Sequence, residues 1–333
     1  MRAACYARTG PAREVLEVRE LPEPRPGPGE VRVRVHVSGV NPTDWKSRSY
    51  GPPLKWPVQV PHHDGAGVID AVGEGVVASR VGERVWVMLA AAERPGGTAA
   101  EATCVPAEHA VPLPADVSFD QGAGLGIPYV TAHRCLVVAA RPPSGRLAPG
   151  ALAGRSVLVR GGAGAVGNAA VQLATRAGAE VVATVGSPEK AEIAAASGAT
   201  RVLDHRAPSH ADELAAAAGR GFDAVVEVAL TSNVETDLAA LAPHGAVVTY
   251  ATEPVDPSVP VRRLMGLNAS LDFVLIYGFD AAMLASAAAD ITEALAEGAL
   301  TPLPSHRFPL EAVVAAHEAV ERGVMGKVLV EIP

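Results

Sequence analysis

Apolar and polar residues alternate early in the chain in the pattern of half-buried β-strands. The valines at every second position from Val31 to Val37 are separated by arginine and histidine, and this period of two predicts a strand with one buried face. Shorter apolar runs at 67–72 and 84–89 predict two more strands, because glycine- and proline-rich turns separate them. We therefore expect the first 120 or so residues to form a β-rich barrel or sandwich.

From residue 156 the pattern changes to short apolar runs that alternate with helical segments. SVLVR, VVATV, RVLD, DAVVEV and AVVTY each have the character of a buried strand, and a helix is expected after each of the first four. This β–α alternation predicts a parallel, doubly wound sheet with helices on both faces. Helices are also expected at 129–140 and near 281–297 and 310–322, and KVLVEI predicts a final strand.

Composition narrows the class of protein. A chain of 333 residues with 49% apolar and 19% charged residues has material for two folded cores. The net charge of −8 argues against nucleic-acid binding, and no run of eighteen apolar residues predicts a membrane span. Three widely spaced cysteines are typical of reduced thiols, and no signal peptide is recognised, so we expect a cytoplasmic protein.

A glycine-rich loop directly after the strand at 157–160 is the clearest chemical signal. Its G-x-G-x-x-G spacing predicts a dinucleotide site, because the glycines allow a tight turn, a close approach of pyrophosphate and tight helix–strand packing. The next helix directs its N-terminal N–H groups at the phosphates. A merely structural glycine turn is the alternative. The expected contacts are Gly162, Gly164, Ala165, Val166 and Gly167.

The end of the second strand of this unit favours NADPH over NADH. NAD sites usually carry a carboxylate there, about 20 residues after the loop, but this chain has Gly186 followed by Ser187. Ser187 and Lys190 supply a hydroxyl and a cation for a 2′-phosphate, and His205 with the arginine that follows it supplies a second polar wall. Glu189 argues the other way, and Ser187 is also a good helix N-cap.

Five segments resemble the medium-chain dehydrogenase/reductase superfamily, and most closely its zinc-independent quinone oxidoreductase (zeta-crystallin-like) branch. They are HVSGVNPTDWKSR, VPHHDGAGVIDAVGEGV, VLVRGGAGAVG, ATVGSPEKAEIAAASGA and FPLEAVVAAHEAVERGVMGKVLVEI. The resemblance implies a GroES-like β-rich catalytic domain at 1–125, completed by 275–333, with a Rossmann NADPH-binding domain inserted at 126–274. It also implies a homodimer or homotetramer, with Leu271–Tyr277 as the candidate interface strand.

Zinc-dependent members of this superfamily have catalytic ligands that this chain lacks. Asn41 stands where the first cysteine would be, and Ile127 or Pro128 roughly where the last would be. His63-Asp64 resembles the family's His-Glu pair, but without a third soft ligand it makes a poor zinc site. We therefore expect no metal and interpret His63 as a cleft or packing residue. Opportunistic metal binding at 62–64 is the alternative.

The segment 41–46 resembles the Asn-Pro-x-Asp-Trp-Lys pattern of quinone and enoyl reductases. The resemblance implies that Asn41 orients substrate or nicotinamide, that Asp44 organises the loop, and that Lys46 polarises a carbonyl oxygen. Turn chemistry for Asn41 and Asp44 and a solvated charge for Lys46 are the alternatives. His63 completes the catalytic candidates. Further candidates for the cofactor site are Thr131, Tyr250 and Lys327.

These residues indicate an NADPH-dependent reductase. Hydride addition to a quinone or to an activated C=C bond needs no Lewis acid, because the substrate itself delocalises the negative charge. The expected partner is therefore a small-molecule quinone or α,β-unsaturated carbonyl compound. A trans-acting enoyl reductase of a biosynthetic pathway and a non-catalytic, crystallin-like NADPH-binding protein are the alternatives.

Overall fold

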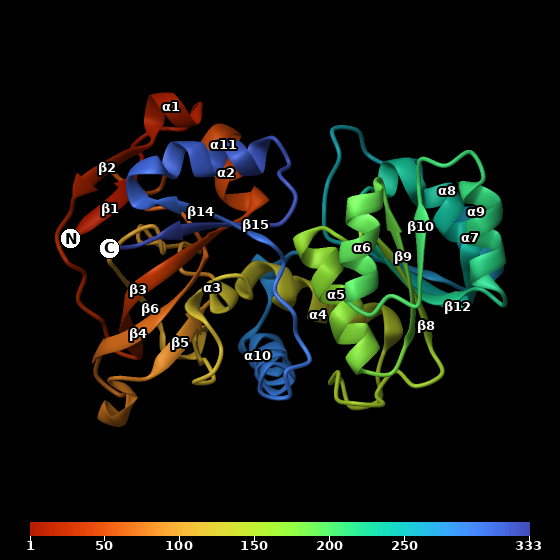
Figure 1. Cartoon of the computed structure of the whole chain (residues 1–333), viewed down its shortest axis with the longest axis horizontal. Helices are drawn as coiled ribbons and strands as arrows, with labels where there is room; N and C mark the ends of the chain where they lie inside the picture. The colour runs from red at the N-terminus through yellow and green to blue at the C-terminus, as the bar shows by residue number, and fades with distance from the viewer. The chain divides into compact units, whose positions relative to one another are not determined.

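The computed structural model describes residues 1–333, and two structural units are separable in it (Figure 1). The first unit comprises Met1–Ile127 and Pro304–Pro333, so both ends of the chain contribute to it. The second unit comprises Pro128–Leu303. None of the helices is both long and apolar enough to span a membrane.

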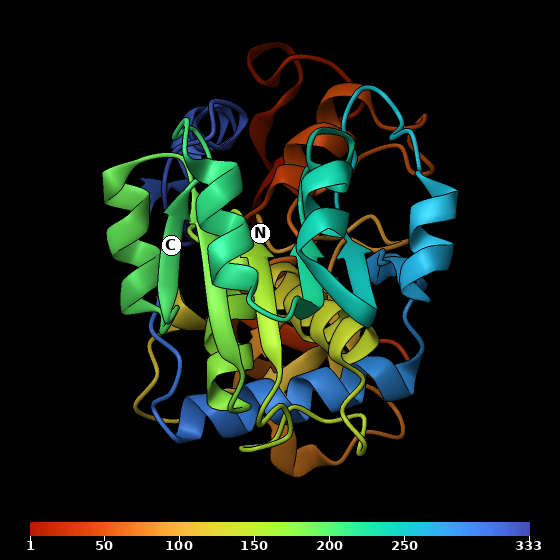
Figure 2. The same cartoon turned by 90° about the vertical axis from the view of Figure 1, so that its right-hand side faces the viewer.

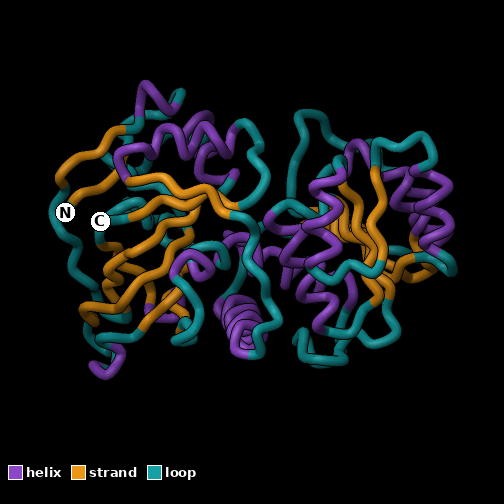
Figure 3. The backbone as a smooth tube through the Cα atoms, viewed as in Figure 1, coloured by secondary structure: helices purple, strands orange, loops and turns teal.

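The first unit is built on a seven-stranded, mostly antiparallel sheet (Figure 3). Its path runs β14-β15-β3-β4-β5-β7, and β6 pairs with β3. Its strands are β3 (Glu30–Val40), β4 (Asp64–Val72), β5 (Arg84–Val87), β6 (Ala102–Pro106), β7 (Ala110–Pro112), β14 (Ser305–Pro309) and β15 (Lys327–Glu331), and β1 (Arg2–Cys5) and β2 (Glu17–Glu20) form a hairpin sheet. Its helices are α1 (Ala12–Val15), α2 (Pro42–Tyr50), α3 (Phe119–Gly122) and α11 (Val313–Glu321), with short 3-10 turns at Ala78–Arg80, Ala107–His109 and Leu310–Ala312.

Strand β3 forms because its alternating side chains face a shared apolar core. Val31 and Val33 are fully buried against Ile69 of β4 and Val85 of β5. The predicted alternation is therefore confirmed over 31–37, and the strand continues to Val40. At its far end β3 pairs antiparallel with β15, which places residues from both ends of the sequence side by side.

The second unit holds a six-stranded parallel sheet (Figure 2). The strand order is β10-β9-β8-β11-β12-β13. The strands are β8 (Ser156–Arg160), β9 (Glu180–Val185), β10 (Arg201–Asp204), β11 (Phe222–Glu227), β12 (Leu241–Thr249) and β13 (Ser270–Phe273). The helices are α4 (Gly126–Ala140, entering from the first unit), α5 (Ala165–Arg176), α6 (Pro188–Ala196), α7 (His210–Ala218), α8 (Leu230–Ala240), α9 (Val261–Leu267) and α10 (Ala281–Ala296), with a 3-10 turn at Ile276–Gly278.

The strand order reverses direction at β8, as in doubly wound folds. Helices α5 and α6 therefore cover one face of the sheet and α7, α8 and α9 the other, since β–α–β crossovers are right-handed (Figure 1). Ligands of such folds bind beyond the carboxyl ends of the strands at this point of reversal. The predicted parallel, doubly wound sheet and the predicted β-rich domain are confirmed.

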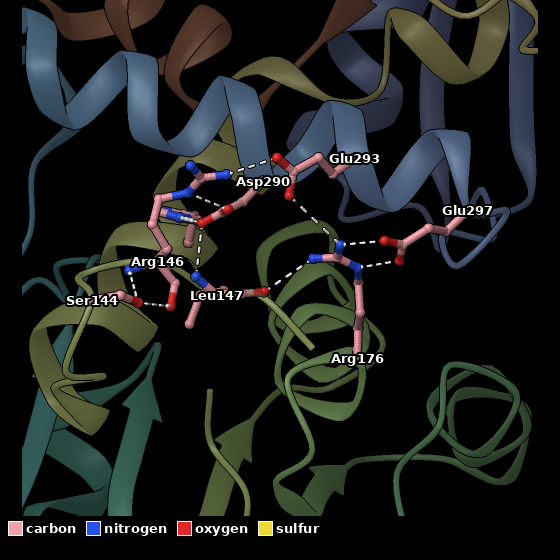
Figure 4. A network of polar contacts seen from close by, with 8 residues as sticks. Ser144, Arg146, Leu147, Arg176, Asp290, Glu293 and Glu297 are labelled. Carbon is pink, nitrogen blue, oxygen red and sulfur yellow. Dashed lines mark hydrogen bonds and ion pairs between the residues drawn. The ribbon is translucent and has the colours of Figure 1, made fainter. Parts of the chain in front are cut away.

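Helix α10 belongs to the second unit, which extends to residue 303, whereas the sequence analysis ended that domain at 274. The buried carboxylate of Asp290 accepts a hydrogen bond from Nε2 of His133 on α4 at 2.7 Å. One end of α10 is held by Glu297, which accepts two hydrogen bonds from Arg176 of α5 (Figure 4). The helical period of 281–297 predicted the helix, but not the unit against which it would pack.

Some elements differ from the sequence-based expectation. Helix α8 begins at Leu230, earlier than the helix expected near 235–242. The sequence analysis also did not anticipate the strands β1, β2, β6, β7 and β14 or the helices α1, α2, α3 and α9. The missed strands are three to five residues long, too short for a period-two pattern to be distinctive.

Candidate active site and cofactor site

The glycine loop connects β8 to α5 in the second unit. Its sharp turn is made by Gly161, with φ of 69°, one residue before the predicted motif. Gly162 packs against the next strand, since a Cβ there would lie 2.7 Å from Cβ of Ala183. Gly167 is required by close packing, because a Cβ there would lie 2.2 Å from the carbonyl oxygen of Gly161. Close packing thus explains why two of the three motif positions, 162 and 167, are occupied by glycine.

The start of α5 fits the diphosphate of a dinucleotide. Gly164 is the exposed N-cap residue, and its missing Cβ leaves the approach open apart from one carbonyl oxygen at 3.3 Å. The N–H groups of the first helical residues, Ala165 to Gly167, have no acceptor within the helix, so they are available to a bound anion. Ala165 and Val166 are half-buried beside them.

Two polar side chains lie over the carboxyl end of β9. A Cβ at Gly186 would lie 2.9 Å from Nε2 of His205 and 3.1 Å from Nε of Arg206. Any larger residue at this position would therefore displace them. Burial, reinforced by the charge of Arg206, lowers the pKa of His205, so its imidazole is mainly neutral at pH 7. The glycine thus makes room for a cation and a hydrogen-bonding ring.

Ser187 caps helix α6, as one of the two sequence interpretations expected. Its hydroxyl oxygen accepts from the backbone N–H of Lys190 at 3.4 Å. A hydrogen bond with Ser187 also lowers the pKa of the exposed Glu189 carboxyl, which is ionised at neutral pH. Lys190 is half-buried on the same helix turn. The cations near Gly186 are thus accompanied by two solvent-exposed carboxylates, Glu189 and Asp204, the second directly before His205.

A buried ionic cluster lies at the end of β8, and the sequence analysis did not identify it. Arg160 donates through Nε to Asp237 at 2.9 Å and through Nη1 to Nε2 of His210 at 3.1 Å. Glu227 lies 3.7 Å from the same guanidinium. Burial and the neighbouring Glu227 raise the pKa of Asp237 to about 8, so one proton remains in this carboxyl pair at neutral pH. The sequence signal that could have indicated this cluster is a charged residue at the end of an apolar strand, as at Arg160 and Glu227.

Two further cofactor candidates also lie in the second unit. Thr131 is buried on α4, and Tyr250 directly follows the carboxyl end of β12. Burial raises the pKa of the Tyr250 phenol well above its usual range, so it stays protonated. Neither residue makes a contact that assigns it a role, and both stay predictions.

In the first unit, Asn41 is held at both ends of its amide. Its Nδ2 donates to Oδ2 of Asp64 at 2.7 Å, and its Oδ1 accepts from Nζ of Lys327 at 2.7 Å. The second oxygen of Asp64 accepts the backbone N–H of Ile127 at 2.8 Å. These bonds use one of the two Nδ2 hydrogens of Asn41 and fix which end of the amide faces which partner.

Asp44 helps to cap helix α2. Asn41 is the N-cap of α2, and the carboxylate of Asp44, three residues later, accepts the Asn41 backbone N–H at 2.7 Å. Burial and the nearby Asp64 carboxylate raise the pKa of Asp44 to about 8. Asp44 is therefore mostly protonated at pH 7.

Lys327 was predicted to bind cofactor, which stays a prediction. Its ammonium contacts Asn41 and lies 3.8 Å from Oδ2 of Asp64. Burial lowers its pKa, and the two carboxyl groups oppose that shift. Lys46, a catalytic candidate, is half-buried on α2 outside this cluster. His63 is buried, which lowers its pKa to about 4, and its backbone N–H is bonded to Asp44. Hydrogen bonds with Asn41 thus connect Asp44 and Lys327 in one cluster.

The residues at 63–64 do not fit a zinc ion. No group of three or more His, Cys, Asp or Glu side chains is arranged to hold a metal. Both oxygens of Asp64 accept hydrogen bonds, and the ammonium of Lys327 stands beside them and would repel a second cation. Cys104 lies on β6, where burial raises the pKa of its thiol to about 12. We derive no step through a metal.

Comparison with known proteins agrees with this arrangement. The family model for the alcohol dehydrogenase GroES-like domain matches residues 27–115, and that for zinc-binding dehydrogenases matches 165–294. The chain is 33% identical to the quinone oxidoreductase of Homo sapiens over 93% of this chain and 91% of the relative. It is 32% identical to that of Rattus norvegicus over 88% and 86%. The chain belongs to the quinone oxidoreductase branch of the medium-chain dehydrogenase/reductase superfamily.

Solved structures of this superfamily superpose over essentially the whole chain. A mycobacterial quinone oxidoreductase has a TM-score of 0.84 at 30% identity, with 99% of both chains covered. A mycobacterial protein complexed with NADPH has a TM-score of 0.81 at 29% identity, again with 99% coverage of both. An NAD-dependent alcohol dehydrogenase gives 0.85 at 29% over 100% of both chains, and the CurK enoyl reductase 0.82 at 25% over 100% and 99%. This member of the superfamily is an oxidoreductase with a nicotinamide cofactor and a small-molecule substrate.

Proposed function

We propose that the protein transfers hydride from NADPH to a quinone or to an activated C=C bond, without zinc. The observation that carries the choice of cofactor is the pair His205 and Arg206 lying over Gly186. A carboxylate at that strand end would bind the ribose 2′-hydroxyl of NAD and repel a 2′-phosphate. The glycine removes that carboxylate, and Arg206 with Lys190 supplies positive charge.

The acceptor is inferred from the relatives and from the chemistry of the first unit. The relatives named above are quinone oxidoreductases, and the residues around Asn41 offer hydrogen-bond donors in place of a Lewis acid. Quinones and enones can accept hydride without a Lewis acid because they spread the developing negative charge over their own π-system.

A bound nicotinamide supplies the hydride, and the side chains bind and orient the acceptor. In the proposed mechanism the Nδ2 hydrogen of Asn41 that does not bond to Asp64 donates to the acceptor's carbonyl oxygen. Lys327 holds the Asn41 amide in this orientation and places a positive charge nearby as negative charge develops on that oxygen. Asp44 keeps its proton at neutral pH, and water supplies the proton that completes the reduction.

Lys46, Thr131 and Tyr250 remain proposals without an assigned contact, and the catalytic role of His63 also remains a proposal. An enoyl reductase of a biosynthetic pathway is the second candidate, and the likeness to the CurK enoyl reductase supports it. A non-catalytic NADPH-binding role is the third, because a glycine loop provides binding but not turnover. Steady-state rates with a quinone and an enone separate the first two. NADPH binding without turnover of either would favour the third.

We also propose a homodimer through the edge strand β13. Phe273 is 69% exposed at the end of this strand, and Leu275 just beyond it is 66% exposed. An exposed apolar edge strand is a template for pairing with another chain. Sedimentation of wild type and of F273K tests this: a dimer that becomes a monomer supports it, and a monomeric wild type contradicts it.

The cofactor proposal is tested with matched variants. R206A and K190A should each raise the KM for NADPH about tenfold, the usual effect of losing a charge-assisted contact, and leave that for NADH unchanged. K55A, which removes an exposed lysine of the first unit, is the control. Equal kcat/KM for NADPH and NADH in the wild type would refute the assignment.

A further inference from the structure

A chain of four buried polar side chains runs from α11 to the start of β4 in the first unit. Nε2 of His317 lies 2.9 Å from Nε2 of His62. Nδ1 of His62 lies 2.8 Å from Oγ of Ser38, which lies 2.7 Å from Oγ1 of Thr98. Thr98 donates to the carbonyl oxygen of Asp64 at 2.5 Å. All four side chains are fully buried.

The last bond fixes the direction of the whole chain. A carbonyl oxygen only accepts, so the single hydroxyl hydrogen of Thr98 is committed to Asp64. Ser38 must then donate its own hydrogen to Thr98 and accept from Nδ1 of His62. His62 therefore carries a proton on Nδ1.

The second nitrogen of His62 is a bare acceptor, because the ring is neutral. Burial lowers the pKa of His62 well below 6.5 and that of His317 to about 3. The titratable groups that act on these rings, Lys327 and His63 on His62 and Arg48 on His317, oppose a further positive charge. His317 must then donate from Nε2, and its buried Nδ1 has no hydrogen-bond partner.

The backbone at His62 is strained to bring its ring into this chain. Its φ of 76° lies in the left-handed region, which is costly for a residue with a Cβ. The conformation is held by the neighbouring segment, since the backbone N–H of Thr98 donates to the carbonyl of His62 at 3.0 Å. Two residues later stands Asp64, whose carboxylate holds Asn41.

We propose that His62 is a positioning residue: through Ser38 and Thr98 it fixes the backbone at Asp64, and thereby the amide of Asn41. The catalytic part of this inference rests on the proposed function. The inferred tautomers of His62 and His317 do not depend on the proposed function. The chain contains no group that accepts a proton at its Asp64 end, so it orients rather than relays.

Matched substitutions follow from the direction of the bonds. T98V removes the donor to Asp64 and should lower kcat roughly 10- to 100-fold, the scale of a small misplacement of reacting groups, while the KM for NADPH stays unchanged. T98S keeps a donor and an acceptor and should retain kcat within about threefold. Position 317 needs only a donor, so H317Q should be far more active than H317L. Equal activity of T98V and T98S would overturn the proposal.

The decisive experiment is made on the wild-type protein. Proton–nitrogen correlation spectra of the histidine-labelled wild type report which ring nitrogen is protonated. We expect His62 protonated on Nδ1 and His317 on Nε2 at pH 7, with assignment by H62N and H317Q. A doubly protonated or Nε2-protonated His62 would overturn the inference. Absence of turnover with every acceptor would refute the proposed function. The spectra would still show whether the hydrogen bonds from His317 to Asp64 run in the inferred direction.

Discussion

Replacing Lys327 by methionine tests the charge balance of the polar cluster. Methionine keeps most of the length of the side chain but removes the ammonium. In the wild type that ammonium is buried, donates to Asn41 at 2.7 Å and lies 3.8 Å from Oδ2 of Asp64. With Asp44 mostly protonated at pH 7, Lys327 is the counter-charge of the Asp64 carboxylate.

The size of the effect follows from that distance. Two unit charges 3.8 Å apart attract by about 4 kcal/mol at an effective dielectric constant near 20. This lies within the roughly 3–5 kcal/mol lost when one partner of a buried pair is removed. Burial raises the pKa of Asp64, and Lys327 opposes this rise. Without that ammonium the pKa of Asp64 rises further in K327M, so Asp64 takes up a proton on folding. The stability gap to the wild type should therefore widen from pH 5 to pH 8.

Urea unfolding followed by circular dichroism at both pH values measures the gap. K55M, at an exposed lysine, should change stability by no more than about 0.5 kcal/mol. In the K327M background, D64N should restore part of the loss, because it removes the uncompensated carboxylate. A loss below about 1 kcal/mol, or additive effects of K327M and D64N, would refute a buried, coupled pair.

Three other predictions test the rest of the structure. G167A should weaken NADPH binding at least about tenfold in a fluorescence titration, because its Cβ would lie 2.2 Å from a backbone oxygen, whereas G266A, with open space around it, should bind normally. Between pH 6.5 and 5 the wild type should lose stability relative to H317Q, since burial lowers the pKa of His317 to about 3, so that the unfolded chain binds a proton there that the folded chain excludes, whereas the raised pKa values of Asp44 and Asp237 act equally in both proteins; a stability difference that does not change with pH would contradict this. D290N should cost about 1–3 kcal/mol in urea unfolding, because this buried carboxylate accepts three donors, and an unchanged midpoint would show that the network is dispensable.

The local pattern of the sequence was enough for the elements that carry a regular period. The valines from Val31 to Val37 fix which face of β3 is buried, because side chains of a strand alternate whatever the strand pairs with. The loop around Gly164 could also be predicted from the sequence, since a tight turn between a strand and a helix restricts both residue type and spacing. The short strands and the placement of α10 could not be predicted from the sequence, because several packings bury the same apolar face.

The candidate site depended on contacts between distant parts of the chain. Lys327 meets Asn41 across 286 residues because β15 pairs with β3 and brings Val328 opposite Val40. A lysine in the sequence carries no sign of that register, so the contact between Lys327 and Asn41 was not predicted.

The sequence by itself therefore determined the family, the two folding patterns and the position of the dinucleotide loop, because these follow from residue types that are close together along the chain. The tertiary structure decided which buried polar groups meet. The partners of Arg160 and the tautomer of His62 depend on side-chain hydrogen bonds from separate elements. Such bonds act over about 3 Å, and only packing of the completed fold brings their atoms within that distance.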